Sequence, residues 1–269
     1  MLKETYKVDL GDALMHVRIY GKGPPLILLA GLGGRGAFWH GQIEAFAASH
    51  RLIVPDHRGC GDSTRGKCVS SIAHMASDFM RMMDTLDIER SKLVGHSTGG
   101  AIGQYLAIFH PERINRLVLS SSWAGPDTYF TKLFEHRKTV LQQCGPEAYL
   151  WQGMVLAIPT NRLQPIMKSG ENIISERLAQ FPGVDVELSR INAVMGHNLR
   201  ERLHEISVPT LCTAALDDQI TPPSFTQELA ANIAGAQIHL FERGGHFCPT
   251  TETEEYNKRV YAFLNQKGT

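Results

Sequence analysis

The chain has 269 residues, of which 43% are hydrophobic and 20% charged, and its 27 basic side chains balance its 27 acidic ones. This composition is typical of a globular protein with one large domain or two small ones. Because no basic stripe or acidic tail is present, a nucleic-acid or membrane partner has no electrostatic support. The first ten residues, MLKETYKVDL, lack the apolar run of a signal peptide, and no segment approaches the ~20 apolar residues that span a bilayer. We therefore expect a cytoplasmic protein.

The five cysteines are odd in number and contain no Cys-x-x-Cys pair. This usage is typical of reduced thiols rather than of a disulfide framework. No zinc-ligand spacing occurs either, so we expect no metal.

The first half of the chain alternates strand and helix patterns. Residues 5–10 and 14–20 alternate apolar and polar side chains around Gly11-Asp12, which predicts a hairpin. The later apolar runs are continuous, as in strands covered on both faces, and lie at 26–30, 51–55, 92–96 and 116–122. Helical patterns between them cover 39–48, 71–87 and 99–109. This alternation predicts a parallel sheet.

One of these helices is rich in methionine. Its apolar side chains recur at helical spacing, at Ile72, Met75, Phe79, Met82, Met83 and Leu86. We interpret this face as helix core rather than as a special pocket.

The strand pattern stops after residue 123. Residues 127–205 contain helical stretches divided by Pro159, Pro165 and Pro182, over 131–143, 146–156, 171–179, 184–194 and 198–205. Strands resume at 210–216 and 237–241, with helices over 224–233 and 253–266. We therefore predict a core of residues 1–123 and 207–269, with residues 124–206 inserted as a helical cap.

The segment Val94-Gly95-His96-Ser97-Thr98-Gly99-Gly100 joins a predicted strand to a predicted helix. Gly-x-Ser-x-Gly in this context indicates a nucleophile elbow, a strained turn that exposes a serine hydroxyl. Small flanking residues are needed because a Cβ would clash with the neighbouring strand or helix. The sequence therefore predicts Ser97 as a nucleophile.

A serine nucleophile needs a histidine base and a carboxylate that orients it. Two later predicted strands are followed by loops that contain a carboxylate and a histidine, Asp217-Asp218 in the first loop and His246 in the second. The order Ser, Asp, His is that of the α/β-hydrolase arrangement. Between the two aspartates we favour Asp218, and Asp217 is then a solvated or turn-capping carboxylate.

The oxyanion of the tetrahedral intermediate needs two backbone donors. We assign them to the N–H groups of Thr98, after the nucleophile, and Leu32, in the glycine loop 31–34. This loop fits neither a P-loop nor a dinucleotide fingerprint, so no cofactor is expected.

With these pieces assembled, the chain resembles the α/β-hydrolase superfamily over nearly its full length. The motifs that carry the resemblance are AGLGG (30–34), DHRGCGDS (56–63), GHSTGG (95–100), DDQITP (217–222) and GGH (244–246). The resemblance implies an α/β-hydrolase fold, an eight-stranded, mostly parallel sheet with a helical cap inserted after the sixth strand. Ala30 departs from the pattern, because many members carry His there.

Within the superfamily the chain is similar to small bacterial catabolic hydrolases, including 3-oxoadipate enol-lactonases and aminoacrylate hydrolase-type proteins. This predicts hydrolysis of a small-molecule ester or lactone, or of a related amide or carbamate bond. A C–C hydrolase, a cofactor-free perhydrolase and a ligand receptor on the same scaffold are alternatives. A homodimer is compatible with this sequence.

The substrate pocket is expected between the elbow and the cap. Candidate lining residues are Phe38, Trp39, Trp123, Trp151, Met154 and Phe247. Arg162, Arg190 or Lys168 could pair with a substrate carboxylate.

Overall fold

The computed structural model of the chain describes residues 2–66, 71–168 and 171–266. Eight strands form one sheet in the order β1-β2-β4-β3-β5-β6-β7-β8. They are β1 (Leu2–Asp9), β2 (Leu14–Tyr20), β3 (Pro25–Leu29), β4 (Arg51–Pro55), β5 (Ser91–His96), β6 (Ile114–Ser120), β7 (Thr210–Ala215) and β8 (Gln237–Phe241). The hairpin β1–β2 and the pair β2–β4 are antiparallel, and the other neighbours are parallel. The predicted mostly parallel sheet is confirmed.

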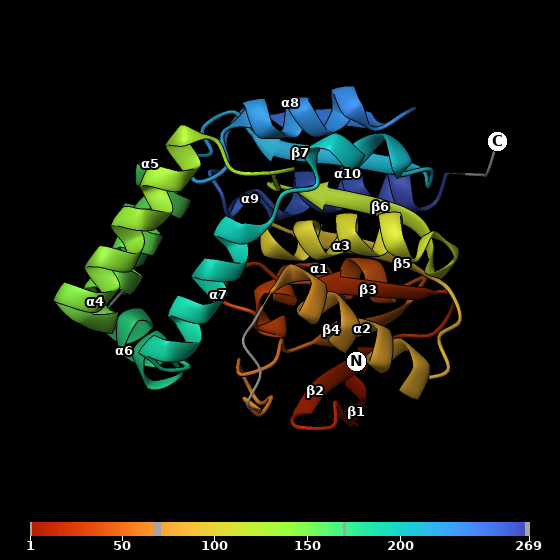
Figure 1. Cartoon of the computed structure of the whole chain (residues 1–269), viewed down its shortest axis with the longest axis horizontal. Helices are drawn as coiled ribbons and strands as arrows, with labels where there is room; N and C mark the ends of the chain where they lie inside the picture. Colours follow the sequence, from red (N-terminus) through yellow and green to blue (C-terminus); the bar gives the residue numbers. More distant parts are fainter. Residues whose placement is uncertain (1, 67–70, 169–170, 267–269) are drawn as a thin grey trace.

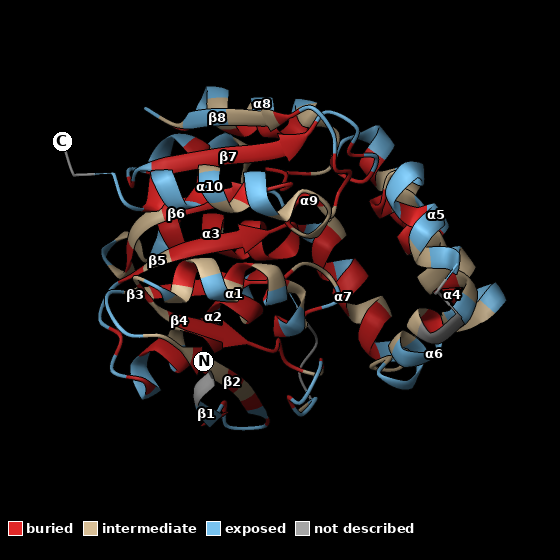
Figure 2. Ribbon diagram, turned by 180° about the vertical axis from the view of Figure 1, so that it is seen from behind, coloured by how far each residue is buried: buried red, intermediate tan, exposed pale blue. Residues whose placement is uncertain are grey.

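Helices cover both faces of the sheet. The core helices are α1 (His40–Ala47), α2 (Ile72–Thr85), α3 (Thr98–Phe109), α8 (Pro223–Asn232), α9 (Cys248–Thr251) and α10 (Thr253–Leu264). Short 3₁₀ turns lie at η1 (Gly36–Trp39), η2 (Pro111–Arg113) and η3 (Arg200–Glu205). Helices α2 and α3 lie in front of the sheet in Figure 1, and α1 and α10 lie in front in the reverse view of Figure 2.

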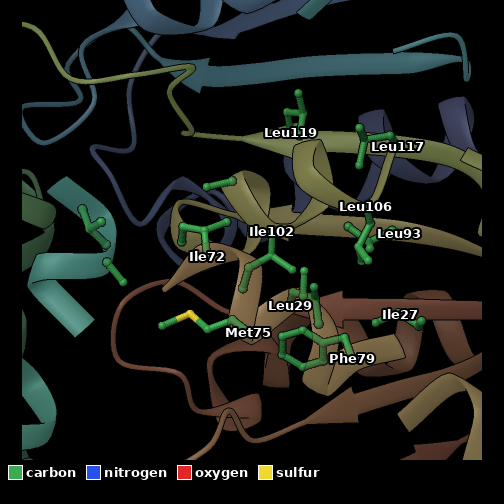
Figure 3. Close-up of a cluster of buried hydrophobic side chains, with 14 of the residues drawn as sticks. Ile27, Leu29, Ile72, Met75, Phe79, Leu93, Ile102, Leu106, Leu117 and Leu119 are labelled. Carbon is green, nitrogen blue, oxygen red and sulfur yellow. The ribbon is translucent and has the colours of Figure 1, made fainter. Parts of the chain in front are cut away.

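The alternation of side chains along β3 shows how the sheet feeds two cores. Ile27 and Leu29 pack into the larger core with α2 and α3, while Leu26 and Leu28 pack into the smaller one with α1 and α10. Figure 3 shows the larger core, with Met75 and Phe79 of α2 close to Leu29. The predicted core face of α2 is buried, including Met75, Met82 and Met83.

Four further helices lie between β6 and β7, as predicted for a cap after the sixth strand. They are α4 (Thr128–Ala157), α5 (Thr160–Lys168), α6 (Glu171–Ala179) and α7 (Val184–Gly196). They stand together at one end of the strands, on the left of Figure 1. The division of the chain at residues 124 and 206 into a core and a separate domain stays a prediction.

Three details of the cap differ from the sequence prediction. Helix α4 runs through both predicted helices 131–143 and 146–156, with a break at Gly145, whose φ is 84°. Helix α5 was not predicted, because Pro165 lies inside it at the expense of one backbone hydrogen bond. Residues 200–205 form only the 3₁₀ turn η3 instead of an α-helix.

Cys60, Cys144, Cys212 and Cys248 are free thiols, in agreement with the prediction of reduced cysteines. Cys68 lies outside the described residues. Within residues 2–66, 71–168 and 171–266, no helix is both long and apolar enough to cross a membrane.

Candidate active site

Parallel strands bring the predicted site residues to one edge of the sheet, because their carboxyl ends lie side by side. The register pairs Leu29 of β3 with Gly95 of β5, and Ala215 of β7 with Phe241 of β8. The loops after these four strands carry Leu32, Ser97, Asp218 and His246. Ligands of open α/β sheets bind at this edge.

Ser97 occupies the turn between β5 and α3. Its backbone is left-handed, with φ 52° and ψ −115°, a conformation that costs a non-glycine residue on the order of 1–3 kcal/mol. The flanking glycines make the turn sterically feasible. A Cβ on Gly95 would lie 2.2 Å from the carbonyl oxygen of Gly99, and one on Gly99 would lie 2.2 Å from that of Leu29.

Asp218 and His246 form a buried pair. The Nδ1 atom of His246 lies 2.9 Å from Oδ2 and 3.1 Å from Oδ1 of Asp218. The carboxylate also accepts hydrogen bonds from the N–H groups of Ile220 and Thr221 and from the Thr221 hydroxyl, each at 2.9 Å. These donors hold the Asp218 side chain turned toward the ring. Nε2 is then the ring nitrogen available to a substrate or nucleophile.

Asp217 has a different environment. It is exposed, and its Oδ1 accepts the N–H of Gly245 at 2.8 Å. This bond supports the Gly244-Gly245 turn that leads to His246. Of the two neighbouring aspartates, Asp218 is therefore the one in contact with His246.

Ser97 and His246 line the same cavity, which has a volume of about 780 Å³. Both side chains are almost buried, with exposed fractions of 7% and 4%. His96 also lines the cavity, with its ring centroid 4.9 Å from that of His246 and 4.7 Å from that of Phe38. Burial and the nearby His246 hold the pKa of His96 well below its usual range, so His96 is neutral at pH 7.

The predicted oxyanion donors belong to two different elements beside Ser97. Thr98 is the first residue of α3, and an N–H in that position has no acceptor within the helix. Residues 31–34 form a tight turn closed by the bond from Gly34 N–H to Gly31 C=O at 2.9 Å. Leu32 is an inner residue of this turn, so its N–H is not used to close it. Leu32 and Ala30 both line the cavity.

Arg190 of α7 holds this turn from the cap side. Its side chain is fully buried, and its Nε donates to the carbonyl oxygen of Leu32 at 2.8 Å. Its Nη2 lies 3.1 Å from Nδ1 of His57. Burial and the adjacent Arg190 hold the pKa of His57 well below its usual range, so Nδ1 can accept this bond. Sequence reasoning missed this contact, because the two partners lie 158 residues apart.

Three of the six predicted pocket residues line the cavity and three do not. Phe38, Met154 and Phe247 are on its walls. Trp39 and Trp123 are buried elsewhere, the first in the smaller core and the second against Phe130 in the larger one. Trp151 packs half-buried against the larger core. A tryptophan that is close in sequence to a site residue can pack in a core as readily as it can contact substrate.

The three cations predicted to pair with a substrate carboxylate do not serve that role in the structure. The guanidinium of Arg190 is engaged by Leu32, and Arg162 pairs with Glu252 at 2.8 Å. Lys168, at the end of α5, is exposed. None of the three presents a free cation to the cavity.

Among the described residues, His16, Asp56 and Asp62 form a cluster with metal-ligand spacing. The guanidinium of Arg18 lies 3.1 Å from Asp56 and 2.5 Å from Asp62. This single guanidinium offsets part of the negative charge of the two carboxylates, and none of these residues lines the cavity.

Comparison with known proteins decides the family. Residues 24–169 match the model of the α/β-hydrolase fold. The chain belongs to the α/β-hydrolase family. It is a hydrolase, since its curated relatives are named as hydrolases and its solved structural neighbours include an enol-lactonase.

Two relatives and one solved structure illustrate the likeness. This hydrolase is 36% identical over 256 residues to "Putative carbamate hydrolase RutD" of Azorhizobium caulinodans, covering 95% of this chain and 97% of the relative. It is 34% identical over 258 residues to the protein of the same name from Caulobacter vibrioides, covering 93% and 95%. The enol-lactonase from Burkholderia xenovorans superposes with a TM-score of 0.85 at 26% identity, covering 98% of this chain and all of the other.

Proposed function

We propose that this hydrolase cleaves a small acyl substrate, a carboxylic ester or lactone or a related amide or carbamate, through an acyl-enzyme on Ser97. The observation that carries the proposal is the contact of Asp218 with His246 at the cavity that Ser97 also lines. The names of the relatives, carbamate hydrolase and enol-lactonase, support this class of bond.

In the proposed mechanism Ser97 Oγ attacks the carbonyl carbon and passes its proton to Nε2 of His246. Asp218 stabilises the imidazolium, and the N–H groups of Leu32 and Thr98 bind the oxyanion. His246 then protonates the leaving group, which departs and leaves the acyl-enzyme. Water enters, gives its proton to His246 and attacks the ester, and Ser97 leaves with that proton. General-base catalysis of this kind contributes roughly 10²–10⁴-fold, and an oxyanion donor roughly 10²–10³-fold.

The test uses p-nitrophenyl acetate and a fluorophosphonate probe. We expect a burst of p-nitrophenol equal to the enzyme concentration, steady turnover after it, and a probe adduct on the peptide that contains Ser97. Ser97→Ala should lose burst, turnover and adduct while keeping its circular dichroism spectrum. Full activity in Ser97→Ala would refute the mechanism. A burst with no later turnover would instead indicate a ligand receptor.

A further inference from the structure

The walls of the cavity carry an unusual excess of positive charge. Four arginines line it, namely Arg35 after the oxyanion turn, Arg137 of α4, Arg162 of α5 and Arg177 of α6. Among the described residues that line it, Glu187 of α7 is the single carboxylate. Cations at this density are uncommon in a cavity otherwise walled by apolar side chains, because burying an unpaired charge is costly.

Existing contacts offset only part of this charge. Arg162 pairs with Glu252. Glu187 accepts the hydroxyl of Tyr149 at 2.6 Å and lies in the field of both Arg137 and Arg190. One carboxylate therefore serves two guanidinium groups on this side of the cavity.

Arg137 shares Glu187 with Arg190, and among the described side chains neither Arg35 nor Arg177 forms an ion pair with a carboxylate. Arg137 has an exposed fraction of only 7%, and its Nε and Nη1 have no hydrogen-bond partner. Its guanidinium lies 4.6 Å from the centre of the Tyr149 ring, a cation–π contact. The Nε of Arg35 is likewise buried without a partner. Burial and the charge of Arg35 both lower the pKa of Arg177.

Arginine does not relieve such repulsion by losing its proton under ordinary conditions. A bound anion relieves it, and the planar fork of guanidinium matches a carboxylate. The cavity has room for a second group besides the acyl carbon at Ser97, since its volume is about 780 Å³. Its aromatic and aliphatic walls, including Phe134, Ile173 and Phe181, suit a short hydrocarbon spacer between the two groups.

We propose that the cavity binds a substrate with a free carboxylate in addition to its scissile acyl bond, and that Arg35, Arg137 and Arg177 hold this carboxylate. The inference rests on the proposed function and narrows its substrate class to anionic acyl compounds.

The test compares two esters with the same five-carbon acyl chain, mono-p-nitrophenyl glutarate and p-nitrophenyl valerate. We expect kcat/KM to be roughly tenfold or more higher for the glutarate, with the difference mainly in KM, and to fall toward equality as salt screens the charges. Arg177→Gln should reduce this preference about tenfold, and Arg137→Gln should do the same. The matched control is Arg162→Gln, which should keep the preference because Glu252 already offsets that charge.

Binding measured without turnover separates the two proposals. Calorimetry on Ser97→Ala should detect glutarate binding that is weakened by Arg177→Gln, with inorganic phosphate binding more weakly. Equal kcat/KM for the two esters would overturn the carboxylate site while leaving the acyl-enzyme mechanism intact. If neither ester is hydrolysed, the proposed function fails, and absence of glutarate binding would then overturn this inference as well. Phosphate binding without glutarate binding would also overturn it. Should Arg137→Gln fail to fold, Arg177→Gln on the half-buried face of α6 carries the test.

Discussion

Replacing Asp218 by asparagine should change the tautomer of His246 while preserving its position. In the native site Oδ1 of Asp218 accepts the N–H groups of Ile220 and Thr221, both at 2.9 Å. An asparagine keeps its oxygen at this position, because these two donors require an acceptor. Its NH₂ group then faces His246 Nδ1, at the position where Oδ2 lies 2.9 Å away. Since NH₂ donates, Nδ1 has to accept, and the ring proton moves to Nε2.

A histidine protonated at Nε2 is unable to take the proton of Ser97. The variant therefore loses general-base catalysis, worth roughly 10²–10⁴-fold, together with the negative charge that stabilises the imidazolium. The same substitution in a serine protease triad lowers kcat by about 10⁴. We expect kcat of Asp218→Asn to fall by about 10³–10⁴ with little change in KM.

Asp217→Asn is the matched control, because its amide oxygen can still accept the N–H of Gly245. Its kcat should stay within about twofold of the parent, since the side chain at position 217 does not contact Nδ1 of His246 and the bond to Gly245 is kept. Steady-state hydrolysis of p-nitrophenyl acetate measures both variants, and circular dichroism checks that they are folded. The reasoning is refuted if folded Asp218→Asn keeps more than a tenth of the activity, or if the two variants lose activity equally.

Three further outcomes are expected. Gly99→Ala should yield little folded protein, because its Cβ would lie 2.2 Å from a carbonyl oxygen, whereas Gly196→Ala meets nothing within 4 Å and should be near neutral in thermal melting. Arg190→Met should lower kcat about tenfold through a loosened Leu32 turn, as removal of a charged hydrogen-bond donor costs about 1.5–3 kcal/mol; unchanged kcat in the folded variant would contradict this role. Burial lowers the pKa of His197 to about 4 in the folded chain. As pH falls from about 6.5 to 4, the unfolded chain therefore binds a proton on His197 that the folded chain does not yet bind. The free energy of unfolding should therefore decline over this window by up to about 3 kcal/mol from this group, and urea titrations of His197→Gln should show a shallower decline.

Much of the fold could be read from local patterns. Continuous apolar runs separated by helical periodicity identify buried parallel strands, and their order already implies where their carboxyl ends meet. The turn at Ser97 can be recognised from the sequence in the same way, because the positions where a Cβ would clash are glycines within four residues of the serine. The break at Gly145 and the helix that contains Pro165 were harder to judge, since cap packing decides whether a helix continues past such residues.

Some features of the candidate site depend on neighbouring residues, and others depend on contacts between residues far apart in the chain. The sequence by itself determined the turn at Ser97 and the glycine turn at Leu32, because each depends on backbone geometry within a few residues. Only the tertiary structure decided that Asp218 rather than Asp217 contacts His246, and that Trp39 and Trp123 are core. It also decided which arginines of the cap face the cavity and that Arg190 instead holds the Leu32 turn. These choices depend on contacts between side chains far apart in the chain, where residue type does not specify the partner.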